Sequence, residues 1–241
     1  MNLFIYETPD EVAEAAARDF AARAEEAINE RGRFAVALAG GSTPKATYGA
    51  LARDYAEELD WSRVHIFFGD ERTVHPEHED SNYRMVRETL LSHVVVGSVH
   101  RMRCELPPEE AAADYERQLR EFFGPDGPRS FDLILLGLGE DGHTASLFPE
   151  TSALDVTDRW VVVNPVLKLG TSRLTLTIPV INAARAVTFL VAGEGKAGAM
   201  REVLEDDADP HAYPAKLIRP ESGDLTWLVD RAATGSLTPP L

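Results

Sequence analysis

The chain has 241 residues, of which 44% are hydrophobic and 27% are charged. This composition is that of a folded globular protein, and no apolar run approaches the roughly 18 residues that a membrane span needs. Lys and Arg total 24 against 40 Asp and Glu, so the formal net charge is 24 − 40 = −16. Such a charge repels nucleic acids and anionic membranes, which argues against a nucleic-acid or membrane partner. An anionic small molecule would need a local cluster of cations.

The single cysteine, Cys104, cannot form an internal disulfide. The first ten residues lack the basic and then apolar pattern of a secretory signal. We therefore expect a cytoplasmic protein. No repeat or long linker interrupts the chain, so one catalytic domain over residues 1–241 is the simplest organisation, and we favour a monomer.

Hydrophobic periodicity predicts alternating helices and strands along the chain. Thr8, Pro9 and Glu11 form a helix start, and apolar residues then recur every four positions up to Gly32. The remaining predicted elements are, in chain order, a strand at 34–38, a helix at 44–51, a strand at 64–68, a polar loop and helix ending near 91, a weak strand at 99–102, a helix at 108–123, a turn at 124–130, strands at 131–136, 160–163, 174–177 and 187–191, a helix at 196–205 and a strand at 225–229.

Near-continuous apolar strands that alternate with helices are typical of a parallel sheet with helices on both faces. We therefore predict an α/β, Rossmann-like fold with a mainly parallel sheet. Ligands of such sheets bind at the carboxyl ends of the strands. Four turns rich in glycine or acidic residues follow predicted strands, and these turns hold the candidate site residues.

The first of these turns contains Gly40, Gly41, Ser42 and Thr43, between a buried strand and a helix. Backbone N–H groups and hydroxyls at a helix N-terminus bind anions readily. A tight turn in which a hydroxyl merely caps the helix is the alternative.

The turn at 137–143 follows the most apolar predicted strand and formally matches G-x-G-x-x-G. We reject a dinucleotide site, because Glu140 and Asp141 would place two carboxylates beside the pyrophosphate. Asp141 and His143 instead form a candidate general base, in which a carboxylate orients an imidazole for proton transfer. A histidine that is simply hydrogen-bonded within its loop is the alternative.

Cations lie at other turns. Arg72 follows Asp70 directly after the second strand, Arg173 precedes a strand, and Lys196 begins a helix. Together with the amides of the first turn they could form the cationic cluster that a phosphorylated ligand needs in so acidic a chain. Ordinary surface ion pairs are the alternative.

Other chemistries lack their motifs. The segment 75–80 contains metal-capable side chains, but no further Cys or His stands at metal-site spacing, so we expect no metal. Neither a G-x-S-x-G elbow nor a phosphate-binding G-x4-G-K-[ST] loop occurs, which removes the serine-hydrolase and P-loop motifs.

These motifs, in their order and spacing, resemble the 6-phosphogluconolactonase family. The resemblance runs the length of the chain, and its most specific stretch is GEDGHTASLFP at 139–149. The related glucosamine-6-phosphate deaminases share the GGSTP motif and the fold, but they follow the DGH turn with a glutamate that assists the histidine. Residues 144–149 contain no acid, which favours the lactonase.

The resemblance implies hydrolysis of 6-phospho-D-glucono-1,5-lactone to 6-phosphogluconate, with neither a metal nor an organic cofactor. It implies that His143 activates water, that Asp141 orients it, and that Arg173 and Lys196 bind the sugar phosphate with help from Ser42 and Thr43. Asp70 would lie near the sugar hydroxyls. For Arg72 three roles stay open: binding phosphate, polarising the carbonyl, or pairing with Asp70.

The chain departs from the family at residues 168–172, where Lys-Leu-Gly-Thr-Ser replaces a Lys-Pro-Pro type segment. Two rival functions remain. One is an isomerase or deaminase of the same fold, which would release ammonia from glucosamine 6-phosphate. The other is a non-catalytic sugar-phosphate sensor, which the acidic first 31 residues disfavour, because such sensors carry a basic DNA-binding segment.

Overall fold

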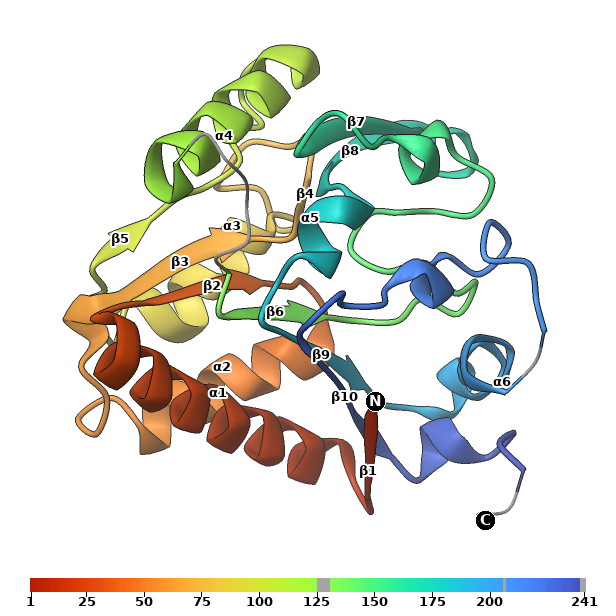
Figure 1. The fold of residues 1–241 in the computed structure, drawn as a ribbon, viewed down its shortest axis with the longest axis horizontal. Helices are drawn as coiled ribbons and strands as arrows, with labels where there is room; N and C mark the ends of the chain where they lie inside the picture. The colour runs from red at the N-terminus through yellow and green to blue at the C-terminus, as the bar shows by residue number, and fades with distance from the viewer. Residues whose placement is uncertain (125–130, 206, 239–241) are drawn as a thin grey trace.

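The computed structural model describes residues 1–124, 131–205 and 207–238. A seven-stranded parallel sheet has the order β1-β10-β9-β6-β2-β3-β5, and a separate three-stranded antiparallel sheet has the order β4-β8-β7 (Figure 1). The strands are β1 (Asn2–Tyr6), β2 (Phe34–Leu38), β3 (Val64–Phe68), β4 (Asp70–Arg72), β5 (Ser98–Val99), β6 (Leu133–Leu136), β7 (Val161–Val166), β8 (Thr171–Leu176), β9 (Ala186–Val191) and β10 (Asp224–Asp230).

Helices cover both faces of the parallel sheet, as the sequence predicts. They are α1 (Pro9–Arg31), α2 (Ser42–Asp54), α3 (Asn82–Val86), α4 (Pro108–Phe123), α5 (Ile178–Asn182) and α6 (Ala197–Leu204), and a π-helical turn (Arg87–Leu91) extends α3. α1 and α2 lie along one face, whereas α4, α5 and the small sheet lie over the other (Figure 1).

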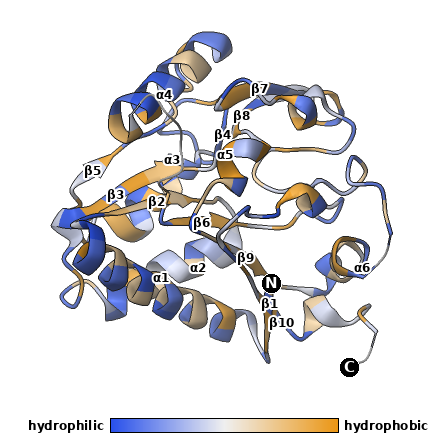
Figure 2. Cartoon of the chain, in the orientation of Figure 1, coloured by the Kyte–Doolittle hydropathy of each residue, from blue (hydrophilic) through white to orange (hydrophobic). Residues whose placement is uncertain are grey.

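The alternation of side chains along each strand separates two apolar cores. In β2, Phe34, Val36 and Leu38 pack with α1 and α2, whereas Ala35 and Ala37 face the core under α4 and the small sheet. The central strands β2, β6 and β9 are therefore apolar at nearly every position, whereas α1 carries hydrophilic residues between its apolar ones (Figure 2). This explains the near-continuous apolar runs in the sequence.

The predicted first helix is confirmed together with its start and end. The Thr8 hydroxyl accepts a hydrogen bond from the N–H of Glu11 at 3.2 Å, and Pro9 is the first helical residue. The helix ends where the N–H of Gly32 donates to the carbonyl of Ile28 at 2.9 Å. Local capping chemistry therefore sets both ends of α1.

The strands predicted at 160–163 and 174–177 correspond to β7 and β8, but they lie outside the parallel sheet. They form the antiparallel pair of β7 and β8, in which Val161 lies opposite Leu176. The physical reason is the short connection of residues 167–170. A parallel pair needs a crossover of about a dozen residues or more, usually a helix.

Other predicted boundaries need smaller corrections. Asp70 to Arg72, expected as a turn, forms β4, and the weak strand at 99–102 shrinks to β5. The predicted helix at 44–51 already begins at Ser42 and runs to Asp54, while that at 196–205 is preceded by a 3-10 turn (Glu194–Lys196). β1 and α5 were not predicted. Residues 125–130 of the predicted turn at 124–130 lie outside the described residues.

Two buried tyrosines fix the backbone where β2 and β3 end. The Tyr48 hydroxyl of α2 donates to the Ala39 carbonyl at 2.8 Å and accepts from the Ala39 N–H at 3.0 Å. The Tyr115 hydroxyl of α4 likewise donates to the Phe68 carbonyl at 3.0 Å and accepts from the Phe68 N–H at 2.8 Å. Burial raises the pKa of both phenols, which keeps them protonated. One tyrosine approaches from each face of the sheet, and together they hold the starts of two loops.

We predict that Tyr115→Phe lowers the free energy of unfolding by about 2 kcal/mol, because it leaves a buried N–H and C=O of Phe68 without a partner. Urea unfolding measures the change. Tyr55→Phe is the matched control, since the Tyr55 hydroxyl has no hydrogen bond in the described part of the chain, and it should change stability by less than about 0.5 kcal/mol. Equal effects of the two substitutions would contradict this role of Tyr115.

Candidate active site

A pocket of about 570 Å³ lies at the carboxyl ends of β2, β6 and β9, beside β4. All ten residues that the sequence singles out line it, although they come from five separate segments. They are Gly40, Gly41, Ser42, Thr43, Asp70, Arg72, Asp141, His143, Arg173 and Lys196. The carboxyl edge of the parallel sheet and the adjoining β4–β8 pair therefore bring the predicted residues together.

The loop after β6 is a compact structure held by its own hydrogen bonds. The N–H of Gly139 donates to the carbonyl of His143 at 2.8 Å, and the Thr144 hydroxyl donates to the carbonyl of Gly137 at 2.8 Å. Ala145 has a φ of +47°, a conformation that L residues other than Asn and Asp rarely adopt. The surrounding loop holds this strained residue at the pocket wall.

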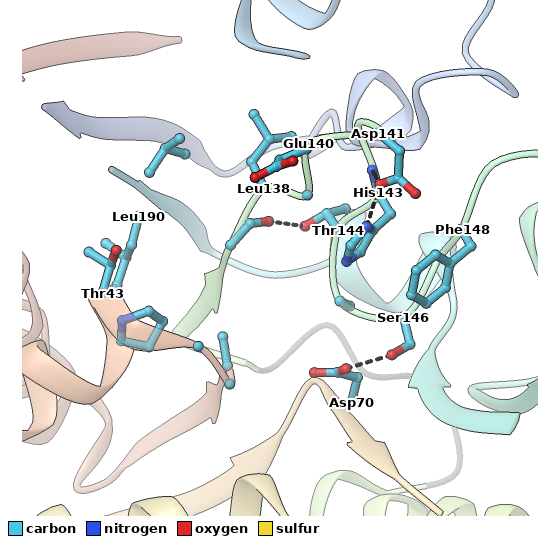
Figure 3. A pocket seen from close by; sticks show the side chains of 18 of the residues that line it. Thr43, Asp70, Leu138, Glu140, Asp141, His143, Thr144, Ser146, Phe148 and Leu190 are labelled. Atoms are coloured by element: carbon cyan, nitrogen blue, oxygen red, sulfur yellow. Dashed lines mark hydrogen bonds and ion pairs between the residues drawn. The ribbon is translucent and has the colours of Figure 1, made fainter. Parts of the chain in front are cut away.

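Within this loop His143 and Asp141 form a hydrogen-bonded pair. The Nδ1 atom of His143 lies 2.5 Å from Oδ1 of Asp141, and the same oxygen accepts the backbone N–H of His143 at 3.3 Å. The ring of Phe148 stacks on the imidazole, with 4.2 Å between ring centroids and 23° between planes (Figure 3). The imidazole is thus fixed in orientation, and its Nε2 has no hydrogen-bond partner in the described part of the chain.

The other oxygen of Asp141 contacts a residue that the sequence does not single out. The Nζ of Lys168, from the turn between β7 and β8, pairs with Oδ2 of Asp141. Partial burial by itself would raise the pKa of Asp141, but the hydrogen bonds from His143 and Lys168 outweigh burial and hold the pKa well below its ordinary value. Asp141 is therefore a carboxylate throughout the neutral range. The chain has only four lysines, and Lys168 begins the segment 168–172 that departs from the family, but neither feature indicates a contact with Asp141.

Asp70 lies on β4 and is only 7% exposed. Its Oδ2 accepts a hydrogen bond from the Ser146 hydroxyl at 2.6 Å (Figure 3). Its Oδ1 accepts one from the Asn82 side chain at 3.2 Å. These bonds join the loop after β6 to β4 and α3. Asp70 is therefore a fixed acceptor in the pocket wall, and Ser146 is a second residue that sequence reasoning missed.

Glu71, next to Asp70, points away from the pocket and organises the start of α3. Its carboxylate accepts the backbone N–H groups of Arg72, Asn82 and Tyr83, each at 2.8 Å, and the Ser81 hydroxyl at 3.2 Å. Burial raises the pKa of Glu71, although these donors oppose the shift. Glu71 thereby fixes Asn82, which in turn contacts Asp70.

Three cations of the pocket have no carboxylate partner in the described ranges. Arg72 and Arg173 lie directly opposite each other in the β4–β8 pair. Arg72 donates to the carbonyl of Asp80, and Arg173 to that of Ser172. Burial and the neighbouring Arg72 lower the pKa of Arg173. The pairing of Arg72 with Asp70 that the sequence left open does not occur. Lys196, in the turn after β9, is likewise without an ion pair among the described residues.

The start of α2 faces the same pocket. Gly41 precedes the first helical residue, and no side chain caps this helix. The hydroxyls of Ser42 and Thr43 make no hydrogen bond to any residue that the structure describes, so the capping alternative for this turn is wrong. Free amides, free hydroxyls and unpaired cations together make a site that can bind an anion.

The segment 75–80 serves local contacts. The carboxylate of Glu77 pairs with Arg87, and the imidazole of His78 lies 3.6 Å from Asp80. Over the ranges 1–124, 131–205 and 207–238, no three His, Cys, Asp or Glu side chains are grouped so as to hold a metal ion. In the same ranges no helix is long and apolar enough to cross a membrane.

A family model described as glucosamine-6-phosphate isomerases/6-phosphogluconolactonase matches residues 7–227. The chain belongs to this family. Curated relatives named 6-phosphogluconolactonase include one from Synechocystis sp., 49% identical over 222 residues and 90% of each chain. Another, from Nostoc sp., is 45% identical over 88% of each chain.

Solved structures of the family have the same fold. That of 6-phosphogluconolactonase from Trypanosoma brucei has a TM-score of 0.88 at 32% identity and covers 98% of each chain. A monomeric glucosamine-6-phosphate deaminase has a TM-score of 0.80 at 23% identity, which shows the shared fold alone. The sequence-based family and fold are thus confirmed.

The close contact around Gly139 gives a test of the histidine pair. A Cβ at Gly139 would lie 2.0 Å from Nδ1 of His143 and 2.7 Å from Oδ1 of Asp141, whereas a Cβ at Gly137 would meet nothing within 4 Å. We predict that Gly139→Ala breaks the hydrogen bond of His143 to Asp141, and that Gly137→Ala preserves it. Nitrogen-15 chemical shifts of the His143 ring report the bond. An unchanged ring spectrum in folded Gly139→Ala would show that the pair tolerates the methyl group.

Proposed function

We propose that this protein hydrolyses 6-phospho-D-glucono-1,5-lactone to 6-phosphogluconate, a step of the oxidative pentose phosphate pathway. The observation that carries the proposal is the oriented Asp141–His143 pair in one pocket with three cations that lack carboxylate partners. The relatives named 6-phosphogluconolactonase, at up to 49% identity, support it. We also propose the cytoplasm as its compartment and a monomer as its state.

The chemistry needs a base but no covalent nucleophile, because a δ-lactone is already a reactive ester. Nε2 of His143 accepts a proton from a water molecule while the water oxygen bonds to the lactone carbonyl carbon. The tetrahedral intermediate then collapses, the bond from carbon to ring oxygen breaks, and His143 returns the proton to that oxygen. Asp141 holds Nδ1 and so directs Nε2 into the pocket. A positioned acid–base group of this kind contributes about 10²- to 10⁴-fold.

The phosphate group would occupy the cationic end of the pocket. Arg173 and Lys196 would bind it, with the hydroxyls of Ser42 and Thr43 and the amides at the start of α2. Arg72 lies directly opposite Arg173 and adds charge there, so of its three possible roles phosphate binding fits best. Two guanidinium groups side by side repel each other, and a phosphate dianion between them removes that cost.

Asp70 would recognise the sugar. Its carboxylate is fixed by Ser146 and Asn82, and its remaining lone pairs can accept hydrogen bonds from sugar hydroxyls. Besides Asp70, the pocket lining has two carboxylates, Glu140 and Asp141, and none among residues 144–149, which follow the DGH turn. A deaminase of this fold would use an acid after the DGH turn, so ammonia release from glucosamine 6-phosphate is not expected.

The direct test is a coupled assay. Freshly generated 6-phosphogluconolactone should disappear, and 6-phosphogluconate should appear, faster than in the protein-free control. No acceleration by the folded protein would refute the proposal, and ammonia release from glucosamine 6-phosphate would support the rival.

We predict that His143→Gln lowers kcat about 10²-fold or more with little change in substrate affinity, because the lost base acts mainly in the transition state. The rate of spontaneous hydrolysis is subtracted. His93→Gln is the control, since His93 does not line the pocket, and it should keep the normal rate. Near-normal turnover of a folded His143→Gln variant would exclude the mechanism.

We predict that Arg173→Ala weakens capture of the phosphorylated lactone about ten- to a hundredfold, as expected for a lost charge-assisted hydrogen bond. Unphosphorylated gluconolactone should be a poor substrate of the natural protein, and Arg173→Ala should reduce its rate far less. The comparison works as a double-mutant cycle in which the second change is the removal of the phosphate from the substrate. Arg18→Ala, which changes the net charge equally outside the pocket, should leave kcat/KM unchanged. Equal losses for both lactones would place Arg173 in folding or in the chemical step.

A further inference from the structure

Lys168 contacts the Asp141–His143 pair through Asp141. It lies in the 3-10 turn Leu167–Leu169 between β7 and β8, and its side chain lines the pocket. Its Nζ contacts Oδ2 of Asp141, the oxygen that His143 does not use. The same Nζ lies 5.1 Å from the ring centroid of Phe148, and that ring stacks on His143. The Lys168 ammonium group therefore contacts both Asp141 and Phe148, the two side chains that hold the His143 imidazole.

We propose that Lys168 is a positioning residue that offsets the charge of Asp141 and so keeps the His143 imidazole free of a second proton at neutral pH. The inference rests on the proposed function, in which this imidazole must accept a proton from water. An imidazole that is already doubly protonated has no lone pair for that proton.

The electrostatics set the direction. A carboxylate beside an imidazole favours the charged imidazolium, and a cation nearby opposes it. Asp141 alone would therefore orient His143 and also favour the imidazolium. With Lys168 on the other oxygen, the carboxylate keeps its hydrogen bond to Nδ1 while its net field at the ring is reduced. The His143 imidazole thus keeps its orientation, and its tendency to take up a second proton is reduced.

The remaining charged groups of the pocket are common to the natural protein and to any Lys168 variant. None of them has a hydrogen bond or ion pair to His143 in the described part of the chain. They are Glu140 of the same loop, Asp70 and Arg72 of β4, Arg173 of β8, and Lys196 after β9. A change on removing Lys168 can therefore be assigned to the Lys168–Asp141 contact.

The size of the effect is moderate because water reaches the lysine, whose side chain is 51% exposed. A buried charge within 4–6 Å shifts a titration by one to three pH units, and exposure reduces this. We expect Lys168→Met to move the acid limb of the kcat/KM profile upward by about half to one pH unit. Well below the midpoint of the limb this corresponds to a loss of about three- to tenfold, and the loss disappears well above the midpoint.

The experiment compares three variants with the natural protein from about pH 5 to pH 9, across the histidine range. Lys168→Met removes the charge at similar length, and Lys168→Arg retains it. Lys45→Met is the control, because Lys45 is exposed on α2, lies outside the pocket lining and changes the net charge equally. The second readout is the titration of the His143 ring by nitrogen-15 NMR, assigned by its loss in His143→Gln, which needs no substrate.

The proposal expects an upward shift of both midpoints in Lys168→Met alone, with Lys168→Arg close to normal. Unmoved midpoints in Lys168→Met overturn it. A raised KM at every pH without a shift would make Lys168 a substrate-binding residue, and a uniform fall in kcat would make it a structural one. Either outcome overturns the proposal. If the natural protein does not hydrolyse the lactone, the proposed function fails, and the NMR midpoints still decide the role of Lys168.

Discussion

The carboxyl edge of the parallel sheet is the constraint on which the site depends. The pocket is built from the segments that follow β2, β6 and β9 and from β4, which comes one residue after β3. In a parallel sheet all strand ends of one kind meet at one edge, so residues distant in sequence become neighbours there. That edge also exposes backbone groups that the ladder no longer pairs. Tyr48 and Tyr115 satisfy such groups from opposite faces of the sheet and hold the loops in place.

The small antiparallel sheet adds what the large sheet cannot supply. It places Arg173 against Arg72, and its β7–β8 turn carries Lys168 to Asp141. Like charges opposite each other destabilise a strand pair. No ion pair to a carboxylate offsets the two arginines in the described part of the chain, so the surrounding packing holds them in place. An anion bound between the two guanidinium groups would remove the repulsion.

Much of this organisation could be predicted from the sequence. The buried runs at 34–38, 64–68 and 131–136 are apolar apart from His65 and Asp132, because both sheet faces are covered. The glycine and acidic turns after them carry site residues. The runs at 160–163 and 174–177 have the same apolar character, since β7 and β8 are also largely buried. Apolar runs alone do not distinguish a parallel strand from one arm of a hairpin.

What could not be predicted are contacts between single atoms of distant residues. Lys168 reaches Asp141 across 27 positions, and Ser146 reaches Asp70 across 76. Neither pair has a spacing or motif that marks it, because side-chain geometry in the folded loops decides which charges meet. The sequence identified the groups of the site more reliably than it identified their partners.

The close approach of Gly40 to Asn82 limits which residues position 40 can accept. A Cβ at position 40 would lie 2.0 Å from Oδ1 of Asn82, and the Asn82 amide also binds the Asp70 carbonyl at 3.0 Å. The loop after β2 and the start of α3 are therefore interlocked through one side chain. A side chain at position 40 would therefore push the Asn82 amide out of place and break its bond to β4. A change in the loop after β2 would in this way disturb Asp70 at the far side of the pocket wall, although the two residues are not in contact through their own side chains.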